Sequence, residues 1–240
     1  IGTVAFYGLT ASPLARFLGL AEEHSNGVLV AGADDWTCDF AKELQDLKIP
    51  VVLVDTNFNK ISKARIAGLD GVCANILTEH ARDELPLAGI GQMMAMTPND
   101  EVNSLAVREC RALFDRAHLY QLSFNAENQH YRRGMTQNLM GRELFAKGLT
   151  FSQMKERHAA GATFKTTRLS DEFTYEDFQN RYNGTSTLLC VLDSSARLSI
   201  NTVAKPLAPV AGDTVVALVE AVAIPQAEDG KGGENLSKTS

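Results

Sequence analysis

Hydrophobic and polar positions alternate along residues 28–123 in a way that predicts strands separated by helices. Unbroken apolar runs predict buried strands, because a strand covered on both faces carries few polar side chains. Such strands are expected at 28–31, 51–54, 71–74, 92–96 and 117–122. Strands spaced by helices run parallel, since each crossover covers one face of the sheet. The pattern therefore predicts an α/β fold with a doubly wound parallel sheet.

The expected helices carry apolar residues at helical spacing. The first covers 36–47, and the second starts after the N-cap Asn57 and runs to about Ala67, where Gly68 ends it. A brief helix near Thr78 and an amphipathic helix over 100–114 follow. The side chains expected to face the core are Trp36, Phe40, Leu44, Leu47, Phe58, Ile61, Ala64 or Arg65, Val102, Leu105, Ala106, Cys110 and Leu113.

The pattern changes after residue 123. Residues 124–160 show no strand signal and are interpreted as a helical connector, with helices at 142–147 and 152–160. Short strands at 162–169, 186–193, 198–203 and 214–219, with a helix over 172–182, predict a small α+β subdomain. The expected division is 1–27, 28–123, 124–160, 161–224 and a disordered polar tail at 225–240.

Residues 1–20 are apolar but contain Pro13 and Arg16, and they lack the basic start and cleavage site of a signal peptide. They fall short of the roughly 20 mostly apolar residues that span a bilayer. The sequence does not begin with Met, so we interpret it as a fragment. Composition leaves two readings open: a helix packed on the domain, or the exit end of a transmembrane helix.

Composition narrows the functional classes. The 240 residues are 45% hydrophobic and carry a net charge of −6, with no stripe of Lys and Arg, which argues against a nucleic-acid partner. The four cysteines (Cys38, Cys73, Cys110 and Cys190) lie far apart in apolar settings and form no CxxC pair. We expect buried, reduced thiols rather than a metal or redox site. The five histidines are scattered without metal-ligand spacing.

The turn after the first strand is the first candidate site. Gly32, Ala33, Asp34, Asp35 and Trp36 occupy the place of the G-x-G-x-x-G phosphate turn of a Rossmann fold. The three glycine positions of this motif correspond to Gly32, Asp34 and Thr37 here, so only the first glycine is present. Asp34 and Asp35 are expected to cap the helix themselves and to repel a pyrophosphate.

A second candidate group follows the later strands. Asp55 lies 23 residues after Gly32 and would bind the ribose hydroxyls of a nucleotide, or cap the next helix. Thr97, Asn99 and Asp100, with Asn103, end the fourth strand. They would contact a ribose or base, or cap the helix that follows. The ligand stays open among AMP, ATP, NAD, a cation held by the acidic residues, or none.

These segments resemble the RCK (TrkA-N/TrkA-C) regulatory module of bacterial cation transporters and channels. The residues that carry the resemblance are 28–32, 51–55 and 96–105, where Thr97 opens a T-x-x-D-E-x-N motif. The later segment 206–216, with a G-D turn before the last strand, is similar to a TrkA-C ending. The resemblance covers about 28–224. It implies a Rossmann-like domain that pairs with a second copy as a homodimer.

Residues 7–20 contain the motif GLT-x-x-P-L-A-R-x-L-G-L and resemble the segment after the last membrane helix of NhaP-type sodium/proton antiporters. This resemblance favours the membrane-proximal reading of residues 1–20. It implies a cytoplasmic regulatory domain at the bacterial inner membrane, joined to a transporter core of the same polypeptide, and no catalysis. Two alternatives stay open: an NAD(P)-dependent oxidoreductase and a ligand-free dimerisation domain.

Overall fold

The computed structural model describes residues 25–79, 81, 84–125 and 140–220. The antiporter-like segment 7–20 and the tail expected at 225–240 lie outside the described residues. The brief helix expected near Thr78 lies partly outside them.

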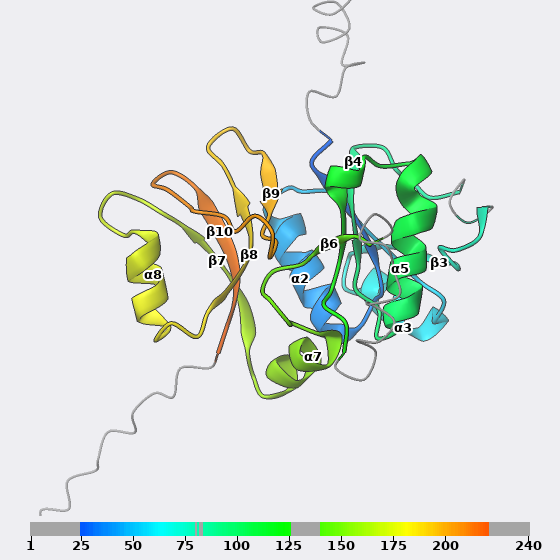
Figure 1. Ribbon diagram of the computed structural model, residues 1–240, viewed down its shortest axis with the longest axis horizontal. Coiled ribbons are helices and arrows are strands. Elements are labelled where there is room, and N and C mark those ends of the chain that lie inside the picture. The colour runs from blue at the N-terminus through cyan, green and yellow to red at the C-terminus, as the bar shows by residue number, and fades with distance from the viewer. Residues whose placement is uncertain (1–24, 80, 82–83, 126–139, 221–240) are drawn as a thin grey trace, which may run out of the picture.

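A six-stranded parallel sheet forms the first unit (Figure 1). Its strands lie in the order β3 (Asp70–Cys73), β2 (Val51–Asp55), β1 (Gly27–Ala31), β4 (Ile90–Ala95), β5 (Leu119–Gln121) and β6 (Arg142–Glu143). The order reverses between β1 and β4, which confirms the predicted doubly wound sheet. In such sheets, ligands bind outside the carboxyl ends of the strands at this reversal.

Strand β1 contributes side chains to both faces of the sheet, because successive residues of a strand point to opposite sides. Val28 and Val30 join the core cluster of helices α2 (Asp35–Asp46) and α3 (Phe58–Ile66). Leu29 and Ala31 join the cluster of α5 (Asp100–Glu109). The sheet is thus covered on both faces, as its apolar strands require.

The second unit is an antiparallel sheet. Its strand order is β7 (Thr163–Arg168), β10 (Thr214–Val219), β8 (Thr187–Leu192) and β9 (Leu198–Ile200). Helix α8 (Tyr175–Arg181) covers its outer face, and α7 (Phe151–Ala159) precedes β7. Figure 1 shows α2 lying between the two sheets. The small α+β subdomain expected from the sequence is present.

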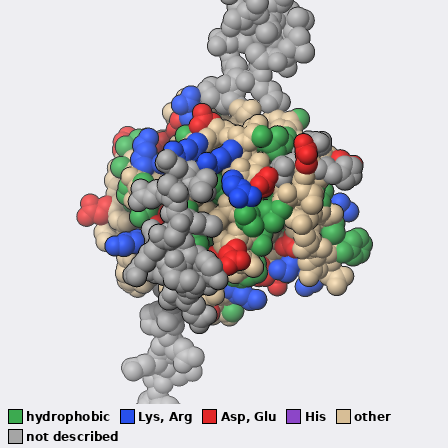
Figure 2. Space-filling view, turned by 45° about the vertical axis from the view of Figure 1, so that its right-hand side comes forward, with side chains coloured by type: hydrophobic (Ala, Val, Ile, Leu, Met, Phe, Trp, Pro, Cys, Tyr) green, Lys and Arg blue, Asp and Glu red, His purple; other side chains and the backbone are tan. Residues whose placement is uncertain are grey.

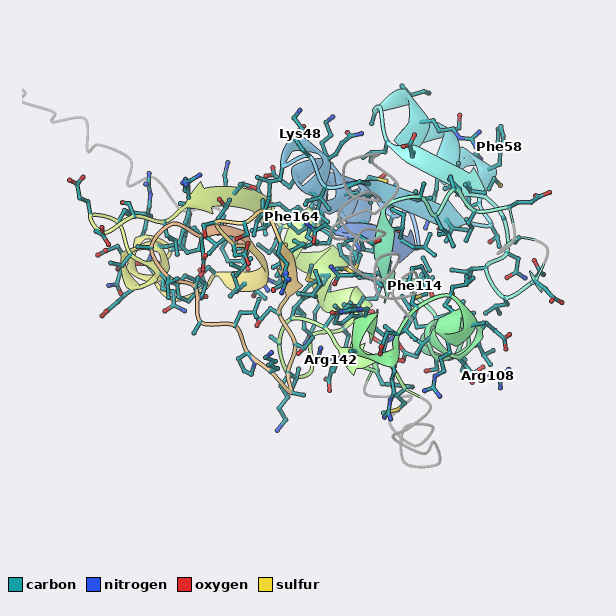
Figure 3. All side chains as sticks on the ribbon, turned by 90° about the horizontal axis from the view of Figure 1, so that it is seen from above. Lys48, Phe58, Arg108, Phe114, Arg142 and Phe164 are labelled. Atoms are coloured by element: carbon teal, nitrogen blue, oxygen red, sulfur yellow. The ribbon has the colours of Figure 1, made fainter. Side chains whose placement is uncertain are left out.

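One hydrophobic cluster runs through both units. The ring of Phe40 on α2 lies 6.0 Å from that of Phe145 and 5.7 Å from that of Phe164 on β7. Phe164 lies where the two units meet in Figure 3. Leu189 and Val216 of the antiparallel sheet belong to the same cluster as Val28. The two sheets therefore share a core through α2.

The helix expected at 142–147 is wrong, whereas the helix expected at 152–160 is confirmed as α7. Residues Arg142–Glu143 instead form β6, which pairs in parallel with Tyr120 and Gln121 of β5. A two-residue strand is too short to show an alternating pattern, so pairing with β5 decides its conformation.

Two expected core positions are also wrong. Phe58 is 65% exposed, and Figure 3 shows it on the outer side of α3, because Ile61 and Ala64 already form the buried face of that helix. Leu113 is 40% exposed. Helix α5 ends at Glu109 and tightens into a 3-10 turn at Cys110–Ala112, so the helical spacing does not extend to Leu113.

The cysteines differ from the expected burial at Cys73 and, in part, at Cys38. All four are free, and Cys110 and Cys190 are buried, but Cys73 is exposed at the end of β3. Burial, with the nearby carboxylates of Asp35, Asp39 and Asp34, raises the pKa of the partly buried Cys38 to about 11.

We expect one fast-reacting thiol when the native chain is titrated with a chromogenic disulfide reagent at about pH 8. Cys73 should be that thiol, because it is exposed, whereas a pKa of about 11 keeps the Cys38 thiol protonated at this pH. Cys73→Ser should remove the fast phase and Cys38→Ser should leave it. Two fast thiols in the native chain would contradict this assignment.

Among the described residues, no helix combines the length and apolar character that crossing a membrane requires. That part of the chain also brings no three His, Cys, Asp or Glu side chains together as a metal site.

Candidate functional site

A crevice of about 310 Å³ opens at the carboxyl ends of β1, β2 and β3, on the side of the sheet that α5 covers. Its apolar walls are Ala31, Val54, Ala74, Ile76, Pro98 and Val102. Its polar lining includes Asp55, Asn57, Lys60, Asn75, Thr97 and Asn99. The volume is at the lower end of the range of small-molecule pockets.

Asp55 is held at the mouth of this crevice as the last residue of β2. Its Oδ2 accepts a hydrogen bond from the Ala33 amide at 2.9 Å, and its Oδ1 accepts one from the Asn57 amide at 2.8 Å. Each carboxylate oxygen has a second lone pair, so Asp55 keeps acceptor capacity toward the crevice. Hydroxyl groups of a ligand are suitable donors.

Gly32 is required by the backbone around it. Its φ is +112°, and a Cβ at this position would lie 2.6 Å from the Met96 carbonyl oxygen. Its amide donates to the Val54 carbonyl at 2.8 Å. The single glycine that survives in the turn thus allows β1 to leave the sheet between β2 and the end of β4.

Asp34 occupies the N-cap position of α2, but its side chain makes no capping hydrogen bond. Its Oδ2 pairs instead with Lys60 Nζ at 3.1 Å, and both side chains are partly buried. The expectation that Asp34 fills the helix donors is therefore wrong, and its charge is paired with a cation. Asp35 lies exposed in the first turn.

Lys60 is the crevice residue that the sequence analysis missed. It lines the cavity and comes from the first turn of α3. A cation there is unfavourable for the helix dipole, so its position was a signal that it has a partner outside the helix. Lys60 offers a positive charge beside the turn where a phosphate would lie.

Trp36 and Thr37 point away from the crevice. The Trp36 ring is 1% exposed and packs 5.7 Å from the ring of Phe151. Thr37 is fully buried. Within the described residues, Trp36 Nε1 and Thr37 Oγ1 have no hydrogen-bond partner. Only the backbone at 36 and 37 therefore remains near the turn.

Replacing Thr37 with Val is expected to stabilise the chain by about 1 kcal/mol, because the change removes a buried hydroxyl that has no partner. Thr202 is the matched control. It is also fully buried, but its hydroxyl accepts a hydrogen bond from Arg142 at 3.1 Å. Thr202→Val should therefore cost about 1–2 kcal/mol. Urea unfolding measures both, and a loss at Thr37 would contradict the expectation.

The loop after β4 is locked by Thr97 and Asn103. Asn103 Oδ1 accepts from the Thr97 amide at 2.9 Å and from its hydroxyl at 2.7 Å, and Asn103 Nδ2 donates to the Thr97 carbonyl at 3.0 Å. Asn99 caps α5, accepting from the amides of Glu101 and Val102. Thr97 and Asn99 line the crevice, while Asn103 is buried behind them.

Asp100 does not line the crevice. It is 3% exposed, and its Oδ2 accepts from the Asn125 amide at 2.9 Å. It joins the start of α5 to the chain that follows β5. The structure thus brings Ala31, Asp55, Thr97 and Asn99 to one cavity with Lys60. Gly32, Ala33 and Asp34 form its adjoining turn, and Asp35, Trp36 and Asp100 lie outside it.

The strand order and the crevice define a Rossmann-like domain followed by an antiparallel α+β unit. Residues 28–139 match the family model of the TrkA-N domain. No curated protein matches the chain in sequence.

The chain also matches solved structures. The TrkA-N domain of the inner membrane protein ybaL from Escherichia coli is 18% identical, with a TM-score of 0.39, covering 45% of this chain and 81% of that one. The GsuK RCK domain is 12% identical, with a TM-score of 0.43, covering 84% of this chain and 46% of that one.

Proposed function

We propose that this chain is the regulatory part of a bacterial cation/proton antiporter, similar to the NhaP-type sodium/proton antiporters. Its crevice senses an adenine nucleotide and adjusts exchange by a transporter core in the inner membrane. The match of residues 28–139 to the TrkA-N domain supports the regulatory class. The main support for a nucleotide ligand is the position of Asp55. Its carboxylate accepts a hydrogen bond from the Ala33 amide and faces the crevice.

The crevice chemistry suits a mononucleotide. The apolar walls from Ala31, Val54 and Ile76 would take the base, and Asp55 would accept the ribose hydroxyls. A phosphate would lie at the start of α2, where backbone amides favour an anion. Lys60 would then balance Asp34 and the phosphate together. Without glycines at positions 34 and 37, close approach of a second phosphate is harder, so AMP is preferred to NAD.

Helix α2 gives the ligand a route to the second unit. Its N-cap residue Asp34 pairs with Lys60, which lines the crevice, and the helix itself contacts β7 and α7. Thr166 Oγ1 donates to Glu43 Oε2 at 2.7 Å, and His158 Nε2 lies 2.8 Å from Asp39 Oδ2. A ligand that prefers one position of α2 would shift the arrangement of the two units, and with it the pairing in a homodimer.

Calorimetry on the 240-residue chain tests the ligand. We expect AMP to bind, and Asp55→Asn to weaken the binding about 10- to 100-fold, since one charge-assisted acceptor is lost. Asp70→Asn is the control, because Asp70 is exposed at the other end of a neighbouring strand. Equal loss in both variants, or no binding of AMP, ATP or NAD, would overturn the ligand assignment and favour a ligand-free assembly domain.

Exchange by the complete gene product tests the regulatory role. In proteoliposomes, Na⁺-dependent proton movement should change when AMP is added on the side of this domain. The Asp55→Asn variant should exchange ions but lose the response to AMP, and the Asp70→Asn variant should keep it. Absence of cation/proton exchange would overturn the antiporter assignment.

A further inference from the structure

A second cavity lies at the amino-terminal edge of the parallel sheet, opposite to the crevice. It consists of two adjoining hollows of about 420 Å³ and about 320 Å³ that share Gln92, His118, Arg197 and Leu198. Strands β4, β5 and β6 of the first unit form one wall, and β9 with the loop after it forms the other. A molecule bound in this junction cavity would therefore contact both units.

The junction cavity is basic. Its lining includes His118, Arg142, Arg197 and Lys205, and no Asp or Glu of the described part of the chain. The whole chain carries a net charge of −6, so this cavity is a local concentration of positive charge on an acidic protein. Figure 2 shows Lys and Arg side chains gathered over the upper part of one face. Positive charges that line one cavity attract an anion.

Arg142 is the anchored cation of this cavity. Its guanidinium lies 5.7 Å from the centre of the Tyr120 ring. It donates to the Ala117 carbonyl at 3.2 Å and to the Thr202 hydroxyl at 3.1 Å. These partners are neutral, and no carboxylate of the described residues pairs with it. The guanidinium is thus oriented but keeps its full charge. Figure 3 shows Arg142 where the two units meet.

Gln92 fixes the floor of the cavity. It is 6% exposed, its Oε1 accepts from the Tyr120 hydroxyl at 3.2 Å, and its Nε2 donates to the Leu198 carbonyl of β9 at 3.4 Å. The same edge is bridged by Asn26, whose Oδ1 accepts from the Leu198 amide at 3.3 Å. The walls are therefore preformed, which lowers the entropic cost of binding.

We infer that the junction cavity binds a small phosphate-bearing anion and thereby holds the two units together. A phosphate group carries close to two negative charges and three acceptor oxygens, which match a guanidinium fork together with a lysine ammonium. Inorganic phosphate and a phosphate monoester share this chemistry. This site is independent of the nucleotide crevice, which lies at the opposite edge of the sheet.

Calorimetry and thermal melting of the 240-residue chain test the inference, with inorganic phosphate and glycerol phosphate as probes. We expect millimolar or tighter binding and a higher melting temperature, and no such effect from chloride at equal ionic strength. Tighter binding of glycerol phosphate than of phosphate assigns an ester, and the reverse assigns the free ion.

Variants locate the site. Arg142→Gln should weaken phosphate binding about 10- to 100-fold. Lys205→Gln should weaken it by a smaller factor. Lys205 is exposed, so its variant tests the site even if Arg142→Gln fails to fold. Arg168→Gln and Lys165→Gln remove the same charges from exposed positions on β7 and should bind phosphate normally.

Three results would overturn the inference: no phosphate binding, an equal effect of chloride, or equal losses in the β7 controls. Lys60→Gln should leave phosphate binding unchanged, because Lys60 lines the crevice at the other edge of the sheet. If Lys60→Gln abolished it, phosphate would be binding in the crevice and the inference would also be overturned. Loss of AMP binding in the Asp55→Asn variant alone would support the nucleotide site in the crevice, whether or not the junction cavity binds phosphate.

Discussion

Replacing Phe40 with Ala is expected to destabilise the chain by about 3–5 kcal/mol, the usual cost of deleting a buried aromatic side chain. Phe40 is fully buried, and its ring packs between those of Phe145 and Phe164. The loss would therefore remove contacts from both units at once. Because the core is continuous, the variant should still unfold in one transition.

Urea unfolding measures this effect with two signals. Trp36 is the only tryptophan and lies in the core that α2 shares between the units, whereas the far-ultraviolet circular dichroism reports the secondary structure of both units. We expect the two midpoints to shift together. Phe58→Ala is the matched control, since Phe58 is 65% exposed and its loss should cost little. Separate midpoints for the two signals would show that α2 does not join the units into one core.

Gly32→Ala is expected to have a similarly large effect, about 3 kcal/mol or more. The position combines a φ of +112° with a Cβ distance of 2.6 Å to the Met96 carbonyl oxygen. A strained backbone region alone costs about 1–3 kcal/mol, and the backbone at the end of β4 cannot move away without breaking its pairing with β1. The same unfolding experiment measures the loss.

Gly68→Ala separates the two causes. Gly68 has a φ of +83°, but a Cβ there would meet no atom within 4 Å. Its variant carries the backbone strain without the collision and should lose about 1 kcal/mol. Equal losses at Gly32 and Gly68 would mean that the contact with Met96 contributes nothing.

The parallel sheet could be predicted because its signals are local. The apolar runs at 28–31 and 51–54 became β1 and β2, and Asn57 and Asn99 cap α3 and α5 with their side chains. Each of these signals depends on residues within a few positions of one another. The position of Asp55 followed in the same way, from the end of a buried strand.

The rest depends on contacts between distant segments. Lys60 reaches the crevice because α3 returns beside the turn at Asp34, and no periodicity shows that. The basic junction cavity joins His118, Arg142 and Lys205, which share no motif. Strand β6 forms only because β5 offers it an edge. Asp100 was expected in the crevice but contacts Asn125, a partner 25 residues away.

Strand β6 also decides how the chain can be shortened. The TrkA-N match ends at residue 139, yet the sheet is completed at Arg142–Glu143. The outer side of β6 is not open to solvent: the Val203 amide donates to the Glu143 carbonyl at 3.0 Å, and Leu144 bridges to Thr202. A chain cut after residue 139 would leave an unpaired β5 edge and bare the α2 face that contains Phe40. Such exposed edges and apolar faces favour aggregation. The smallest piece expected to fold without aggregating therefore includes β9, the loop through Lys205 and also β10, which pairs with both β7 and β8. The two units form one folding unit.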